Sequence, residues 1–357
     1  MAGSTYGTLF KITTWGESHG KGIGVVVDGC PAGLELNEED IQVFLDRRKP
    51  GKSKFATKRM ESDSVEILSG LFEGKTTGTP ISMVIFNESH RPSDYDDIAS
   101  YYRPGHADYT FDQKYGFRDY RGGGRSSGRE TIGRVAAGAI ASKLLKTYGI
   151  EICTYAKSIG HIDIDYAKFN KKEIFNNALY MPDADAAKEA SELLTQKMSE
   201  LNSVGGIVEC VVTGMPAGVG EPVFDKLDAN LAKAIMSIGA VKGFEIGDGF
   251  AAAKSFGSVN NDAFRFENGK VVKTTNHAGG ILGGISDSSD IILRAAFKPT
   301  ASIFSEQQTI NNKNENISIK IKGRHDPIIV PRAVVVVESM VAITLLDMLM
   351  LSKHSKL

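Results

Sequence analysis

The sequence has few cysteines, and none of them are closely spaced. Its three cysteines, Cys30, Cys153 and Cys210, lie far apart in a chain of 357 residues. A disulfide framework or a cysteine-based zinc site needs paired or clustered cysteines. The sequence therefore excludes both and is typical of a reducing compartment.

The chain also lacks an excess of charge of either sign. It has 42 lysines and arginines against 43 aspartates and glutamates, a formal net charge of −1. No overall electrostatic field therefore favours nucleic acid or an anionic membrane. Any binding of anions must come from local clusters of cations.

Targeting and membrane signals are absent as well. The first ten residues lack the basic-then-apolar pattern of a signal peptide. The one long apolar run, residues 333–351, contains Glu338 and Asp347, so it predicts a buried helix rather than a membrane span. We expect a soluble cytoplasmic protein with a sizeable core, built as one large domain or two moderate ones.

The seven histidines show no metal-binding spacing. No His-x-x-x-His or Glu-x-x-His pair occurs, so no metal site is predicted.

The sequence does contain an internal echo. Segment 26–33, Val-Val-Asp-Gly-Cys-Pro-Ala-Gly, resembles segment 211–218, Val-Val-Thr-Gly-Met-Pro-Ala-Gly. Each reads as a strand that ends in a Gly/Pro turn and precedes a helix. The echo predicts an internal duplication, with halves of roughly residues 1–200 and 201–357.

Hydrophobic periodicity and capping signals place several elements. Asn37 is the expected N-cap of a helix over residues 37–48, with Asp40 in its first turn. Further helices are expected at 133–148, 183–201 and 224–238, and strands at 65–71, 81–87 and 317–322. The mixture predicts an α/β protein of α+β type with antiparallel pairing.

A segment rich in glycine and arginine spans residues 120–131. Its four glycines permit close backbone approach, and Arg125 and Arg129 stand beside the expected start of a helix, where free N–H groups attract anions. The spacing matches neither a Walker loop nor a dinucleotide fingerprint. A phosphate-type ligand site, a plain surface loop and an RGG-type RNA segment all remain open.

A second basic segment lies around residues 50 and 51. A solvated surface, a polyanionic small substrate and nucleic acid are the alternatives for its cations. They are Arg47, Arg48, Lys49, Lys52, Lys54, Lys58 and Arg59.

Two histidines, His19 and His106, lie in glycine-bounded turns. A turn histidine is more often incidental than catalytic, but two in similar settings favour a role in proton transfer near neutral pH. Later segments could also bind a ligand: residues 276–286 with four glycines, residues 298–302, and the Arg-His-Asp triplet 324–326.

Taken together, these segments resemble the chorismate synthase family over nearly the whole chain. The resemblance rests on segments 16–20, 46–48, 103–108, 125–131, 276–286 and 323–327, in the order in which the family has them. It implies the 1,4-anti elimination of phosphate from 5-enolpyruvylshikimate 3-phosphate to give chorismate, in the shikimate pathway. It also implies that reduced FMN is required although the reaction has no net redox change.

The resemblance assigns roles residue by residue. His19 would protonate the leaving phosphate, His106 would hold the protonation state of the reduced flavin, and Asp326 would act through flavin N5 on the substrate proton. The implied flavin contacts are Arg125, Ser126, Ser127, Gly239, Ala240, Gly283, Lys298, Pro299, Thr300, Ala301, Ser302 and Arg324. The implied substrate contacts are Arg48, Lys54, Arg103 and Arg129.

Three residues depart from the common family pattern. Lys54 replaces arginine, so the two parallel hydrogen bonds that a guanidinium can donate to an anion are replaced by the single charge of an ammonium group. Gly239 replaces asparagine or proline, and Ala301 replaces serine, so a side-chain contact and a hydroxyl are missing.

The resemblance further implies a sandwich of antiparallel sheets around helices, a single domain over residues 1–357, a homotetramer, and an external flavin reductase as electron source. The alternative is a nucleic-acid-binding module that uses the two basic segments. Few aromatic residues, Tyr120 among them, flank these segments, which counts against base stacking.

Overall fold

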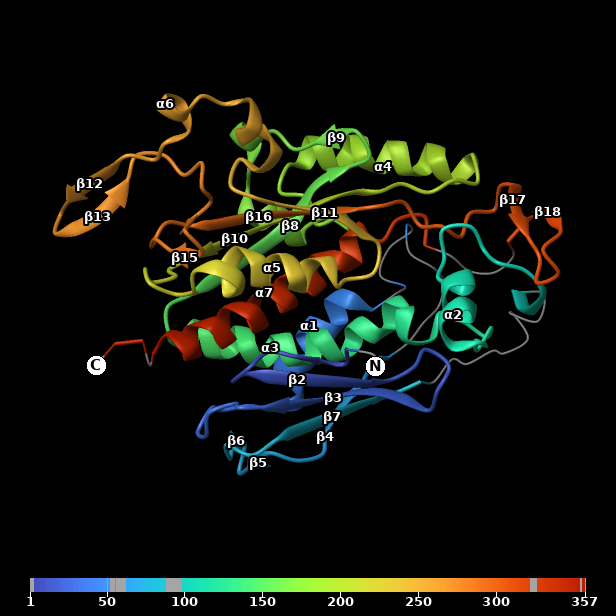
Figure 1. Ribbon diagram of the computed structural model, residues 1–357, viewed down its shortest axis with the longest axis horizontal. Coiled ribbons are helices and arrows are strands. Elements are labelled where there is room, and N and C mark those ends of the chain that lie inside the picture. Colours follow the sequence, from blue (N-terminus) through green and yellow to red (C-terminus); the bar gives the residue numbers. More distant parts are fainter. Residues whose placement is uncertain are drawn as a thin grey trace.

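The chain folds into two five-stranded antiparallel sheets with a layer of helices between them (Figure 1). The computed structural model describes residues 3–49, 51, 55, 62–87, 98–321, 326–353 and 355–356. The predicted fold class, a β-α-β sandwich of antiparallel sheets around helices, is confirmed.

The first sheet is built from the N-terminal part of the chain. Directly paired residues such as Val25 with Met83 and Ile23 with Ile85 are fully buried, so one face of this sheet forms core. Its strands in spatial order are β1 (Thr5–Tyr6), β2 (Lys11–Gly16), β3 (Gly22–Asp28), β7 (Ile81–Phe86) and β4 (Val65–Ile67).

The second sheet covers the other side of the helices. Alternate residues of one central strand, from Ile291 to Phe297, are buried, as period-2 alternation requires of a sheet with one face on the core. Its strands in spatial order are β11 (Val241–Ile246), β16 (Ile291–Phe297), β10 (Gly206–Thr213), β8 (Glu151–Ile159) and β9 (Ile162–Asp163).

Four helices make up the central layer. The first begins as predicted, because the Asn37 side chain accepts from the Asp40 N–H while the Asp40 carboxylate accepts from the Asn37 N–H. The helices are α1 (Glu38–Arg48), α3 (Thr131–Thr147), α5 (Leu227–Met236) and α7 (Val330–Ser352).

α3 and α7 cross in close contact. A Cβ added at Gly138 of α3 would lie 2.2 Å from the Cβ of Ser339 in α7. The small residues that the sequence places in α3 therefore allow the two backbones to approach each other closely.

α7 is the apolar run that the sequence analysis expected to be a buried helix. Among the described residues it is the one helix long and apolar enough to cross a membrane, and 89% of its most apolar window is buried inside the protein. Its two acids have protein partners: Glu338 accepts from Arg47, and Asp347 accepts from the backbone N–H groups of residues 8–10. The prediction of a buried helix is confirmed.

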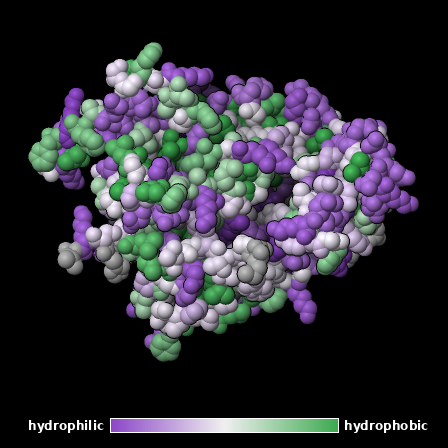
Figure 2. All heavy atoms as spheres, in the orientation of Figure 1, coloured by the Kyte–Doolittle hydropathy of each residue, from purple (hydrophilic) through white to green (hydrophobic). Residues whose placement is uncertain are grey.

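The remaining helices and the two-stranded hairpins lie outside the two five-stranded sheets and the central helix layer. On the face shown in Figure 2, hydrophilic side chains gather at the end with α2 and the β17–β18 hairpin. The helices are α2 (Asp108–Tyr115), α4 (Ala184–Ser199) and α6 (Gly257–Asn260). The hairpins are β5 (Leu71–Phe72) with β6 (Lys75–Thr76), β12 (Phe264–Glu267) with β13 (Lys270–Lys273), β14 (Ile281–Leu282) with β15 (Ile285–Ser286), and β17 (Gln307–Ile310) with β18 (Asn316–Ile319).

The internal echo has the same hydrogen bonds in both copies. The Thr76 hydroxyl donates to the Pro31 carbonyl at 2.6 Å, and the Ser286 hydroxyl donates to the Pro216 carbonyl at 2.6 Å. In each copy a short hairpin, β5–β6 or β14–β15, thus closes against the Gly/Pro turn. The second sheet, however, already begins with β8 at Glu151, so residues 151–200 lie with the second sheet rather than the first. The division into two halves stays a prediction.

Candidate active site

Three helix ends meet beside the segments that the sequence analysis singled out. At the end of α1, Arg48 Nη1 donates to the carbonyl of Gly128, just before α3, at 3.1 Å. In the first turn of α7, Arg332 Nε donates to the carbonyl of Arg48 at 2.9 Å. The N-terminal ends of α3 and α7 carry partial positive charge and the C-terminal end of α1 carries partial negative charge, so the two positive ends outnumber the negative one and the meeting point favours anions.

A buried group of three charges lies at this point, and we call Arg48, Asp63 and Arg129 the arginine cluster. Arg48 Nη2 donates to Asp63 Oδ2 at 2.9 Å, and Arg129 Nη1 lies 3.2 Å from Asp63 Oδ1. The Arg48 and Asp63 side chains are 1% and 0% exposed, and that of Arg129 is 7% exposed. Two predicted substrate residues are thus brought together by one carboxylate that was not predicted.

The arginine cluster holds more positive than negative charge. Burial lowers the pKa of Arg48 to about 10, although Asp63 acts in the opposite direction. Burial alone would raise the pKa of Asp63, but the positive charges of Arg48 and Arg129 outweigh it and hold the pKa below its ordinary value. Arg48 Nε is also buried without a hydrogen-bond partner among the described residues. An anion bound here would offset the excess charge.

The His19 turn is tied to this cluster through Asn87. Arg129 Nε donates to Asn87 Oδ1 at 2.9 Å, and Asn87 Nδ2 donates to the carbonyls of Glu17 at 3.1 Å and Gly20 at 2.8 Å. The turn that carries His19 is therefore held next to a predicted substrate arginine.

His19 also packs against the glycine- and arginine-rich segment. A Cβ at Gly122 would lie 2.2 Å from the Cε1 atom of His19, so this position accommodates the imidazole ring only as glycine. The ring nitrogen Nδ1 shares a hydrogen bond of 2.9 Å with the Ser18 hydroxyl.

Arg125 is directed at the end of β2. It donates to the Gly16 carbonyl at 3.0 Å, the Thr14 carbonyl at 3.2 Å and the Thr14 hydroxyl at 2.7 Å, and it lies 3.7 Å from Glu130. Much of the hydrogen-bonding of the Arg125 guanidinium is therefore to the protein itself, and these bonds join the loop to β2.

The two serines that follow Arg125 shape the turn. Ser126 lies in the 3₁₀ turn η2 (Gly124–Ser126), and its hydroxyl donates to the Gly123 carbonyl at 2.7 Å. Ser127 is the N-cap of η3 (Gly128–Glu130), where its hydroxyl accepts from the Arg129 N–H at 3.3 Å. These bonds place Arg125 and Arg129 on successive turns before α3.

The His106 turn is closed by an ion pair. Arg103 donates from Nε and Nη2 to the two oxygens of Asp108, at 2.8 and 2.7 Å, and its backbone N–H donates to the same carboxylate at 3.0 Å. The pKa of Asp108 is lowered because these contacts with Arg103 outweigh the effect of burial. Arg103, predicted to bind substrate, is committed to Asp108 in this structure.

Segment 298–302 lies against the same turn. His106 Nε2 shares a hydrogen bond of 2.7 Å with the Ser302 hydroxyl, and Lys298 Nζ donates to the Gly105 carbonyl at 2.7 Å. A Cβ at Gly105 would lie 2.9 Å from that of Ala301, so Ala301 packs on the turn. The Lys298 N–H donates to the carbonyl of Ala240 at 3.0 Å, which brings the predicted pair Gly239 and Ala240 to this segment.

Arg332 joins the His106 side of the site to the arginine cluster. Its Nη1 donates to Asp326 Oδ2 at 2.5 Å, while its Nε reaches the Arg48 carbonyl. The backbone carbonyl of Asp326 accepts from the Thr300 hydroxyl at 2.7 Å. A continuous set of contacts therefore runs from His106 through Asp326 and Arg48 to His19.

Three glycines in these segments present open backbone. A Cβ at Gly124, Gly128 or Gly239 would meet nothing within 4 Å. A flat ligand could therefore approach the peptide planes beside Arg125, Arg129 and Ala240, as a flavin contact would require. At Gly239 the missing side chain leaves space, so a backbone contact remains available.

One predicted contact, Gly283, does not join this set, and two others fall on residues that the structure does not describe. Gly283 lies in the turn between β14 and β15, at the opposite end of α5 and β16 from Ala240 and Lys298. Arg324 and Lys54 lie outside the described residues.

Four residues of the site were not assigned a role from the sequence: Asp63, Asn87, Asp108 and Arg332. Asp108 stands inside the recognised segment 103–108, so its spacing from Arg103 could have suggested the ion pair. Asp63 and Arg332 belong to no such segment, and only their contacts reveal them.

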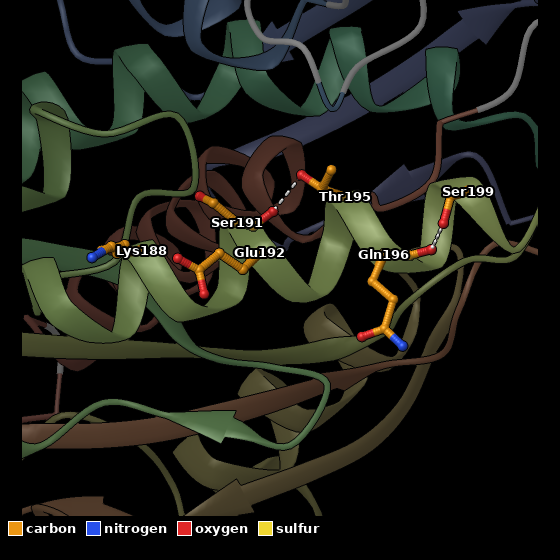
Figure 3. Close-up of a pocket in the computed structure, with 6 residues that line it drawn as sticks. All are labelled: Lys188, Ser191, Glu192, Thr195, Gln196 and Ser199. Atoms are coloured by element: carbon orange, nitrogen blue, oxygen red, sulfur yellow. Dashed lines mark hydrogen bonds between the residues drawn. The ribbon is translucent and has the colours of Figure 1, made fainter.

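A groove on α4 lies apart from this site (Figure 3). It is open to solvent along a single helix, and the hydroxyls of Ser191, Thr195 and Ser199 donate to carbonyls of that helix. The groove therefore offers few groups for a ligand. Its lining residues are Lys188, Ser191, Glu192, Thr195, Gln196 and Ser199.

Within the described residues, no group of His, Cys, Asp and Glu side chains is suited to hold a metal ion.

The chain is similar to known proteins over nearly its whole length. The chain is 67% identical over 357 residues to a chorismate synthase of Agathobacter rectalis, covering 100% of this chain and 97% of that protein. It is 57% identical over 352 residues to a chorismate synthase of Methanosarcina mazei, covering 97% and 96%. A solved structure described as a crystal structure of chorismate synthase superposes with a TM-score of 0.76 at 32% identity, covering 97% of this chain and 92% of that one.

The family profile described as chorismate synthase matches residues 10–350. With a profile match over most of the chain and relatives of this identity, the chain belongs to the chorismate synthase family.

Proposed function

We propose that this enzyme converts 5-enolpyruvylshikimate 3-phosphate to chorismate by 1,4-anti elimination of phosphate. In this reaction the C–O bond to phosphate breaks, the C6–H proton leaves, and the ring gains one double bond. The observation that carries the proposal is the excess of buried positive charge in the arginine cluster, with the two histidine turns joined to it. A substrate with a phosphate and two carboxylates would supply the missing negative charge.

The residues present fit a flavin. Open peptide planes at Gly124, Gly128 and Gly239 lie beside polar groups of the loop 123–129 and of segment 298–302. Reduced FMN, when bound, would supply electron density that helps the phosphate leave and would recover it, so that no net redox change occurs. Arg125, Ser126, Ser127, Ala240 and Lys298 to Ser302 would hold it.

The chain's own residues would move the protons. We assign His19 to protonate the departing phosphate, since its turn adjoins Arg129 through Asn87. His106, bonded to Ser302, would hold the protonation state of the cofactor. Asp326 would take up the substrate proton, with its carboxylate oriented by Arg332.

Anaerobic incubation with reduced FMN and 5-enolpyruvylshikimate 3-phosphate tests the proposal. We expect release of one phosphate and formation of chorismate. Chorismate is detected by its absorbance, and phosphate by a phosphate assay. Absence of phosphate release from folded protein would reject the function.

Variants of the proton-transfer residues test the assignment. His106→Ala and Asp326→Ala should lose most turnover while FMN affinity stays within a modest factor, because neither is proposed to supply the main binding energy. The matched control is His161→Ala, an exposed histidine in the turn between β8 and β9, which should keep wild-type turnover. Loss of FMN binding in either site variant would show a structural role instead.

Nucleic acid binding gains no support from the geometry. Among the described cations of the two basic segments, Arg47 pairs with Glu338, Arg48 with Asp63, and Arg121 with Asp119. The Arg47 and Arg48 side chains are largely buried, and the exposed Arg121 is offset by its own aspartate, so these three groups do not form an exposed row of cations that a nucleic-acid backbone could contact. A homotetramer in the cytoplasm, served by an external flavin reductase, is proposed from the family alone.

A further inference from the structure

We propose that Asp63 is a positioning residue of the active site, whose carboxylate holds the guanidinium groups of Arg48 and Arg129 at the spacing that the anionic substrate needs. This inference rests on the proposed function. Asp63 belongs to none of the recognised segments, and its place in the cluster follows only from its contacts.

The first argument is the geometry of the shared carboxylate. Each oxygen of Asp63 faces a different arginine, Oδ2 with Arg48 at 2.9 Å and Oδ1 with Arg129 at 3.2 Å. The two arginines come from different elements, the end of α1 and the turn η3 before α3. Like charges so close together repel, and in a buried site water screens that repulsion weakly. A negative charge between them offsets this repulsion and so lets both guanidinium groups stay close.

The second argument is the backbone at Asp63. Its φ of 46° lies in the left-handed region, which is costly for a residue with a side chain. Asparagine and aspartate tolerate this conformation better than most residues. The chain therefore adopts a strained conformation at the residue whose carboxylate reaches both arginines.

The third argument is that the cluster is anchored on its other sides. Arg48 also donates to the Gly128 carbonyl and Arg129 to Asn87, which in turn holds the His19 turn. A shift of either guanidinium would therefore move the site as well as the ion pair. Asp63 acts on substrate through these arginines and is not expected to touch it.

The substitution Asp63→Asn tests the proposal, since it keeps the volume and tolerates the left-handed backbone. The matched control is Glu209→Gln, which removes another buried carboxylate paired with an arginine, Arg294, at 2.6 Å on the second sheet. Turnover is measured anaerobically with reduced FMN, and stability by thermal unfolding.

We expect Asp63→Asn to raise KM for 5-enolpyruvylshikimate 3-phosphate about tenfold or more, the usual effect of losing charge-assisted contacts, with a smaller change in kcat. Glu209→Gln should lower the unfolding temperature but leave KM within about twofold, because such remote effects do not couple to the site. A KM within twofold of wild type in Asp63→Asn would overturn the proposal.

Two further measurements make the result decisive. If Asp63→Asn does not fold, Asp63→Glu keeps the charge but displaces the carboxylate by one methylene; a raised KM supports positioning, and a wild-type KM overturns it. If the wild type shows no turnover, the proposed function fails, and calorimetric titration with inorganic phosphate still tests Asp63. Weaker phosphate binding by Asp63→Asn supports the proposal. Equal or tighter binding shows that Asp63 only offsets charge and overturns it.

Discussion

At the residue scale, two arginine–aspartate pairs share one geometry in different surroundings. Arg103 donates hydrogen bonds to the Asp108 carboxylate from Nε, Nη2 and the backbone N–H, at 2.8, 2.7 and 3.0 Å. Arg121 donates hydrogen bonds to the Asp119 carboxylate from the same three groups, at 2.8, 2.7 and 3.0 Å. The first pair is buried and closes the His106 turn, whereas the second is largely exposed. The difference in burial decides how much each pair contributes.

We predict that Asp108→Asn destabilises the protein by about 3–5 kcal/mol, because it leaves the buried Arg103 charge without its partner. Turnover should fall as well, since the turn that carries His106 loses its closure. Chemical denaturation and the anaerobic assay measure the two effects. The control Asp119→Asn should leave the stability nearly unchanged, as solvent screens that pair; the control concerns stability alone, because Asp119 also interacts electrostatically with His19. Equal losses in the two variants would contradict the argument from burial.

At the element scale, the close crossing of α3 and α7 requires a residue without a side chain at position 138. Gly138 lies where a methyl group would collide with Ser339. Alanine has a higher helix propensity than glycine, worth about 1 kcal/mol. Forcing extra volume into a packed core costs about 1–3 kcal/mol. The packing effect therefore outweighs propensity at this position.

We predict that Gly138→Ala lowers the free energy of unfolding, measured by urea denaturation. Gly257→Ala in the short helix α6 is the control, because a Cβ there meets nothing within 4 Å and the change should be neutral or slightly stabilising. If Gly138→Ala proved as stable as the control, the close crossing would be wrong.

At the scale of the whole molecule, several carboxylates with lowered pKa values make the stability of the fold depend on pH. Burial alone would raise the pKa values of Asp63, Asp108 and Asp287, but contacts with Arg48, Arg103 and Lys273 lower them. Such groups stay ionised to lower pH when folded than when unfolded. Their stabilising contribution is therefore complete above the unfolded pKa of about 3.9 and is lost as pH falls towards the folded values.

We predict that the free energy of unfolding changes little through these groups from pH 7 to about 5 and falls steeply below about pH 4. Urea denaturation across this range measures it. Asp63→Asn should show a shallower acid dependence than wild type, because one of the titrating groups is gone. An unchanged stability down to pH 3 would show that these ion pairs contribute nothing.

Several helices and strands of the fold could be predicted from the sequence. The helix cap at Asn37, the apolar run of α7 and the strands that end in Gly/Pro turns depend on neighbours within a few residues, so local patterns predict them. The recognised segments also carried His19, His106 and Asp326. Local patterns did not place the start of the second sheet at β8, because strand pairing is a long-range property.

The sequence by itself determined the fold class, the four helices of the central layer, and the residue types that an anion-binding, proton-transferring site requires. Only the tertiary structure decided which charges meet: that Arg47 turns to Glu338, that Arg103 is committed to Asp108, and that Asp63 and Arg332 gather the groups around Arg48. The physical reason is distance along the chain. Arg332 and Arg48 are 284 residues apart, and no local pattern reports that the ends of α1 and α7 come together.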